Sequence, residues 1–124
     1  MIDNYINYLK ENRLFYRQVN DTLISFSSMG LNMYFVYDKI DPYFARIVVP
    51  TIADGRDLKP GDWERIALIN AQMKLSKVVK IEGNVWISCE QFIENPEDCE
   101  TVFNKMIRSL KNTYDVYARN MVNK

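Results

Sequence analysis

The chain has 124 residues, which is enough for one domain with a hydrophobic core and too few for two ordinary domains. Hydrophobic residues make up 48% of the sequence and charged residues 26%, proportions typical of a folded globular protein rather than a disordered chain. The 16 lysines and arginines balance the 16 aspartates and glutamates, which argues against a nucleic-acid binder held by bulk positive charge.

The first half of the chain predicts one helix followed by three strands. Apolar residues between Ile2 and Leu9 recur at helical spacing and predict a short amphipathic helix. β-Branched and aromatic residues are then dense in three segments, 22–28, 31–38 and 43–49. Turn residues such as Met29-Gly30 separate these segments, so we expect antiparallel strands joined by tight connections.

The middle one of these strands has two different sides, because side chains alternate along a strand. The side expected to face the core carries Leu31, Met33, Phe35 and Tyr37. The opposite side carries Asn32, Tyr34 and Val36. This second side mixes polar and apolar groups, and we expect it to be where a partner binds.

The second helix is expected over residues 63–75, after Pro50 ends the third strand and a polar loop leads to Asp62 as the cap. One arc of this helix carries Trp63, Ile66, Ala67, Ile69 and Met73, and another carries Leu68, Ala71 and Leu75. A helix that lies on a sheet needs only one apolar arc, so the surplus predicts a second contact, either with the last helix or with a second subunit. Asn70 falls within the first arc, where we expect its amide to find hydrogen-bond partners and to fix the adjoining loop.

A hairpin and a final helix complete the chain. Gly83-Asn84 lies between the apolar segments 78–81 and 85–88, a spacing that predicts a two-residue hairpin with a primed turn. Pro96 and the acidic residues after it predict the start of the last helix. Apolar positions of that helix recur by threes and fours at Cys99, Phe103, Met106, Leu110, Tyr114, Tyr117 and Met121.

The expected elements form a single domain over residues 1–124, in the order helix, three strands, helix, two strands, helix. Runs of strands joined by tight turns indicate an α+β fold, with helices packed against one antiparallel sheet, rather than alternating units around a parallel sheet. The first residues show no basic leader before a long apolar run, and no segment approaches the roughly 18 apolar residues of a membrane span. We therefore expect a cytoplasmic protein that does not enter a membrane.

Several classes of catalytic and cofactor chemistry lack the residues they need. The sequence has no histidine, which excludes Ser-His-Asp and Cys-His arrangements. Its four glycines are isolated and form neither a dinucleotide-binding nor a phosphate-binding motif. Cys89 and Cys99 are too far apart for a CxxC motif and are expected to be buried or half-buried free thiols. We expect no catalytic residue, no metal site and no cofactor.

The segments 66–70, 78–81 and 85–88, together with the order of the elements, resemble the YbjN family. The domain of that family is similar in fold to the bacterial type III secretion chaperones. The resemblance implies a homodimer that uses the second helix and neighbouring strands, with partner segments lying over apolar grooves. On this sequence it implies partner or dimer contacts at Trp63, Ile66, Ile69, Val85 and Ile87.

These observations favour a non-enzymatic, chaperone-like or adaptor protein of bacterial type that dimerises and binds a protein or peptide segment. One alternative is a small-ligand enzyme or sensor that uses carboxylates and tyrosines in a pocket on the sheet. A second alternative is single-stranded nucleic acid stacked on the aromatic strands, which the balanced charge disfavours.

Overall fold

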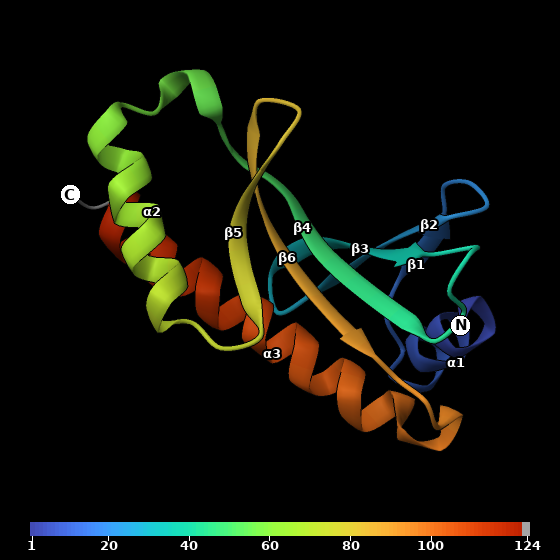
Figure 1. Cartoon of the computed structure of the whole chain (residues 1–124). Helices are drawn as coiled ribbons and strands as arrows, with labels where there is room; N and C mark the ends of the chain where they lie inside the picture. Colours follow the sequence, from blue (N-terminus) through green and yellow to red (C-terminus); the bar gives the residue numbers. More distant parts are fainter. Residues whose placement is uncertain (123–124) are drawn as a thin grey trace.

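The computed structural model describes residues 1–122 and is shown in Figure 1. Its helices are α1 (Ile2–Glu11), α2 (Pro60–Gln72) and α3 (Cys99–Tyr117). Its strands are β1 (Tyr16–Gln18), β2 (Leu23–Ser28), β3 (Leu31–Tyr37), β4 (Phe44–Asp54), β5 (Ser76–Ile81) and β6 (Asn84–Phe92). Short 3-10 helices lie at Gly55–Asp57 and Pro96–Asp98, and a π-helical turn at Ala118–Val122 follows α3.

Within the described residues, the six strands form one antiparallel sheet in the order β1-β2-β3-β4-β6-β5. Helix α3 runs along one face of this sheet, whereas α2 lies beside the edge strand β5 (Figure 1). Helix α1 packs near the start of α3, at the other end of the sheet (Figure 1). The α+β class and the antiparallel sheet predicted from the sequence are confirmed.

The core lies between the sheet, α3 and α1, and aromatic rings join the three. The ring of Tyr5 from α1 stacks on Phe35 of β3 at a centroid distance of 4.2 Å and lies 5.2 Å from Phe103 of α3. The Tyr5 hydroxyl donates to the carbonyl of Val36 and accepts the N–H of Arg46, so this buried polar group is satisfied. The alternation predicted for the middle strand is confirmed, since Met33 and Phe35 are fully buried.

Two hairpins have the primed turns that match the twist of their strands. In the β5–β6 hairpin both turn residues have positive φ, 50° at Glu82 and 82° at Gly83. The predicted two-residue turn is confirmed in type but begins one residue earlier, because Asn84 already pairs with Ile81. The β2–β3 hairpin repeats this geometry at Met29 and Gly30.

The strands before α2 differ from the prediction in number and length. The structure has four rather than three, because β1 pairs with β2 although all three of its residues are exposed and show no apolar alternation. Pro50 does not end β4, which continues to Asp54. The pairing of β4 with β6 shifts between Val49 and Ala53, and proline is tolerated at such a bulge because the ladder of hydrogen bonds is already interrupted there.

The helix boundaries also move. Helix α2 begins at Pro60 and ends at Gln72, three residues earlier at each end than predicted. Asp62 does cap the helix, but from its third position, where a carboxylate oxygen accepts the N–H of Lys59 at 3.0 Å. The apolar spacing predicted for α3 is confirmed, with buried side chains that include Cys99, Phe103, Met106, Leu110 and Tyr117.

Candidate functional site

One face of the sheet carries no helix within the described chain, and we call it the open face. In Figure 1 the helices lie behind the sheet, beside it or at its end, which leaves this face uncovered. Its side chains are those that alternate with the core positions of the four strands β3, β4, β6 and β5. They include Tyr34, Val36, Arg46, Val48, Val79, Trp86, Ser88 and Glu90.

A shallow hollow of about 460 Å³ lies on the open face, over strands β4, β6 and β5. Its lining consists of Arg46, Val48, Leu75, Lys77, Val79, Ile81, Ser88 and Glu90. Four of these eight side chains are aliphatic, so the hollow is an apolar surface with a few polar groups set into it.

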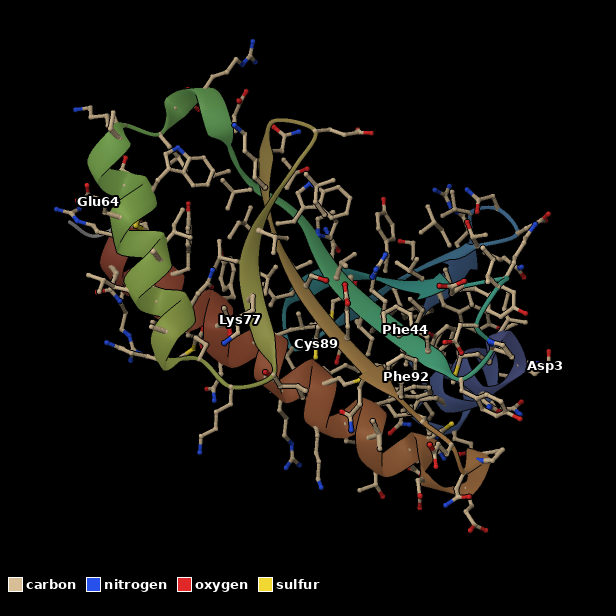
Figure 2. The ribbon with its side chains drawn as sticks, in the orientation of Figure 1. Asp3, Phe44, Glu64, Lys77, Cys89 and Phe92 are labelled. Atoms are coloured by element: carbon tan, nitrogen blue, oxygen red, sulfur yellow. The ribbon has the colours of Figure 1, made fainter. Side chains whose placement is uncertain are left out.

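An ion pair crosses the hollow between neighbouring strands. Arg46 of β4 and Glu90 of β6 face each other in the sheet register, and Nη2 of Arg46 lies 3.0 Å from Oε1 of Glu90. Nε of the same arginine donates to the same carboxylate oxygen. The Arg46 guanidinium also lies 5.3 Å from the ring centroid of Phe44, whose ring meets that of Phe92 where the two strands lie side by side (Figure 2). Both charges are therefore already compensated within the chain.

Trp86 lies on the open face, opposite Val79 of β5. Its indole is half-buried, yet its Nε1 atom is shielded from solvent and has no acceptor among residues 1–122. A buried donor without an acceptor costs about 1–3 kcal/mol. Val48 is only 2% exposed although its side chain points to this face, so the open face contains a packed apolar patch of its own.

Strand β5 forms the outer edge of the sheet, and side chains of α2 and β5 cover this edge. Asn70 donates to the carbonyl of Val78 and accepts its N–H, both at 2.8 Å, in the way a neighbouring strand would. Lys77 in turn donates to the carbonyls of Asn70 and Met73 at the end of α2, toward which Figure 2 shows it directed. The prediction that the Asn70 amide finds hydrogen-bond partners is confirmed, although those partners lie in strand β5 rather than in the adjoining loop.

Most of the five contacts implied by the family resemblance lie in the core. Ile66 and Ile69 are 4% and 5% exposed, and Val85 and Ile87 are fully buried. Trp63 is half-buried, with Nζ of Lys80 5.5 Å from the centroid of its ring. A partner that binds this fold as it stands therefore reaches only Trp63 among the five.

The surplus apolar surface of α2 has a simple explanation. The arc with Ile66 and Ile69 packs inside the chain, where α2 contacts β5, α3 and the turn after α3. The second arc faces solvent, with Leu68 65% exposed and Leu75, just beyond the helix, 41% exposed. Of the open-face residues, Trp86 had been indicated from the sequence by its alternation with Val85 and Ile87, whereas Val48 of β4 and Val79 of β5 were missed.

The titratable groups of the site give little support for acid–base chemistry. Glu90 is the carboxylate in the lining of the hollow, and Arg46 holds it in an ion pair. Burial raises the pKa of the Cys89 thiol to about 12, so this thiol stays protonated, and both cysteines are free and buried as predicted. Hydrogen bonds from Arg56 lower the pKa of Asp54 to about 2, but this pair lies at the 3-10 helix after β4.

Neither the side chains of the described residues nor sequence comparisons assign the site to a known class. No group of three or more potential metal-binding side chains occurs in the described residues, and none of their helices is long and apolar enough to cross a membrane. The chain matches no protein-family model and no curated protein sequence. The resemblance to the YbjN family therefore stays a prediction that rests on residues 66–88.

Proposed function

We propose that this protein binds a segment of a partner protein on the open face of its sheet. The observation that carries the proposal is the uncovered face itself, where four aliphatic side chains and a few polar ones line a hollow of about 460 Å³. Contiguous apolar surface with polar groups set into it is typical of protein-interaction sites. The partner segment would cover Val79 and Ile81 and place polar groups near the ion pair of Arg46 and Glu90.

The finer parts of the proposal follow from the resemblance to chaperone-like proteins. We propose a chaperone or adaptor of the type III secretion chaperone class, located in the cytoplasm and active as a homodimer. The apolar side chain that α2 offers to a second subunit is Leu68, rather than Ile66 or Ile69. Light scattering at micromolar concentration tests the dimer, and a strict monomer would contradict it.

The two alternatives receive less support from the site. A small-ligand enzyme or sensor that uses carboxylates and tyrosines would need several such groups in one pocket on the sheet, but the hollow is lined by one carboxylate and no tyrosine. Single-stranded nucleic acid would need a row of exposed aromatic rings on the strands. In β3, the strand on which this alternative rested, Phe35 is in the core and of the aromatic residues only Tyr34 lies on the open face, so β3 offers one ring rather than a row.

The proposal is tested with an array of peptides that vary in hydrophobicity, probed with the wild-type protein and two variants. Val79→Asp puts a charge on the open face, where the side chain is half-buried and solvent can reach it. Ile40→Asp is the matched control at a 95% exposed position between β3 and β4, outside the hollow. We expect apolar peptides to bind the wild type and the control, and Val79→Asp to weaken binding about tenfold or more. Equal binding by both variants, or no peptide binding at all, would contradict the proposal.

A further inference from the structure

A second hollow, of about 450 Å³, lies between α3 and the connection from α2 to β5. We call it the basic hollow. It is lined by Gln72, Met73, Lys74, Leu75, Lys105, Arg108, Ser109, Asn112 and Thr113. Three of these residues carry a positive charge, and no acidic residue contributes to the lining. The chain as a whole is neutral, so the hollow concentrates one sign of charge.

The cations of the basic hollow lack the pairing found elsewhere in the chain. Five ion pairs occur among the described residues, and none involves Lys74, Lys105 or Arg108. Lys105 and Arg108 are neighbours at i and i+3 on α3, where like charges destabilise a helix. One turn further along the same helix, Lys111 has an acidic partner, Asp115, at 3.0 Å. An acidic ligand would relieve this uncompensated charge.

One residue joins the basic hollow to the hollow on the open face. Leu75 lines both and is 41% exposed. Its φ is 71°, a left-handed conformation that non-glycine side chains rarely adopt and that costs conformational energy. The connection is fixed in this shape because Ser109 donates to the carbonyl of Lys74 and accepts the N–H of Ser76. An apolar residue with a strained backbone is thereby held at the point where the two hollows meet.

We propose that the bound partner segment continues from the open face over Leu75 into the basic hollow, where it places acidic side chains against Lys74, Lys105 and Arg108. The inference rests on the proposed function and adds the chemistry of the partner, an apolar stretch followed by glutamates or aspartates. Met73 and Leu75 contact the apolar part of the segment. The unpaired cations select the acidic part by charge complementarity.

The first experiment compares two synthetic peptides. One has six residues that alternate between valine and threonine, followed by four glutamates, and the other has four glutamines in place of the glutamates. Binding is measured by fluorescence anisotropy, and contacts are mapped by the backbone amide signals of Ser109 and Asn112. We expect the glutamate peptide to bind about tenfold more tightly, and raised salt to remove most of that difference. Equal affinity of the two peptides would overturn the inference.

Variants that remove positive charges show whether peptide binding depends on the cations of the basic hollow or on the net charge of the protein. Lys105→Gln combined with Arg108→Gln should weaken binding of the glutamate peptide about tenfold. The matched control combines Lys10→Gln with Arg119→Gln, two exposed cations that lie outside both hollows. An equal loss in the control would overturn the inference. So would displacement of the glutamate peptide by inorganic phosphate at a similar concentration, because the hollow would then bind small anions.

The role of Leu75 is tested with a pair of glycine substitutions. Leu75→Gly and Met29→Gly both relieve a positive φ, 71° and 53°, at an exposed side chain. We expect both to unfold at equal or higher temperature than the wild type, and only Leu75→Gly to lose affinity for the peptide. If Leu75→Gly bound the peptide with unchanged affinity, the inference that the partner segment passes over this residue would be overturned. A different result would contradict the proposed function, namely that Val79→Asp leaves binding of the apolar half of the peptide unchanged.

Discussion

At the scale of single residues, burial decides which side chains react and which stabilise the fold. Ile66 is 4% exposed in the core, and Leu68, two positions further on the same helix, is 65% exposed. Both are large aliphatic residues in an apolar stretch of sequence, so composition does not distinguish them. Their different positions around the helix do, since two positions along a helix correspond to a rotation of about 200° and so to different surroundings.

Ile66→Asp should therefore unfold the protein or lower its free energy of unfolding by more than about 3 kcal/mol, because it buries an unpaired charge. In the monomer, Leu68→Asp should change that free energy by no more than about 0.5 kcal/mol, because this side chain is 65% exposed. Urea unfolding monitored by tryptophan fluorescence measures both. A folded Ile66→Asp protein of normal stability would show that this position is a surface rather than core.

Cys89 should resist alkylation in the folded protein. Its pKa is raised to about 12 by burial, and only the thiolate reacts. At pH 8 we expect iodoacetamide to label Cys89 only after denaturation, as mass spectrometry of tryptic peptides would show. Because the folded state disfavours the thiolate, the contribution of Cys89 to stability is complete below pH 9 and declines as the pH rises toward 12. Rapid labelling of the native protein would contradict the burial of this thiol.

At the scale of elements, side-chain hydrogen bonds hold the connection between α2 and β5 in place. Asn70 pairs with the outer backbone groups of Val78, and Lys77 caps the carbonyls at the end of α2. An exposed strand edge is open to pairing with another chain, and natural proteins cover such edges. Asn70 thus joins two elements and closes one edge of the sheet.

Asn70→Ala should lower the free energy of unfolding by about 1–3 kcal/mol, because it leaves the N–H and the carbonyl of Val78 without partners. It should also increase association at high protein concentration, since the β5 edge becomes available. Chemical denaturation and light scattering measure the two effects. Gln72→Ala, an exposed position two residues further on, is the control and should change neither. A stable, monodisperse Asn70→Ala protein would contradict this role.

At the scale of the whole molecule, the sheet has a protected centre and less protected edges. Strands β4 and β6 lie inside the sheet and pair with neighbours on both sides, whereas β1 is a three-residue edge strand with all its side chains exposed. Native-state hydrogen exchange should be slowest at the amides of Ile47 and Ile87 and fast in β1. Equal protection of β1 and β4 would show that the sheet opens as a single unit.

Elements whose signal lies within one segment could be predicted from the amino-acid pattern alone. Alternation predicted the two sides of β3, spacing by threes and fours predicted the buried stripe of α3, and Gly83 indicated a primed hairpin. These patterns depend on the periods of strand and helix, which every local segment carries. Free buried thiols and a satisfied Asn70 were also predictable, because buried polar groups need partners and isolated cysteines pack as apolar residues.

Only the tertiary structure decided where those elements lie and what they leave exposed. Helix α2 lies beside the β5 edge instead of covering the sheet, which puts Ile66 in the core and leaves Val79 on an open face. The bulge at Pro50 and the gathering of Lys74 with Arg108 depend on segments far apart in the sequence. Such contacts are set by the packing of whole elements, so no local period of the sequence records them.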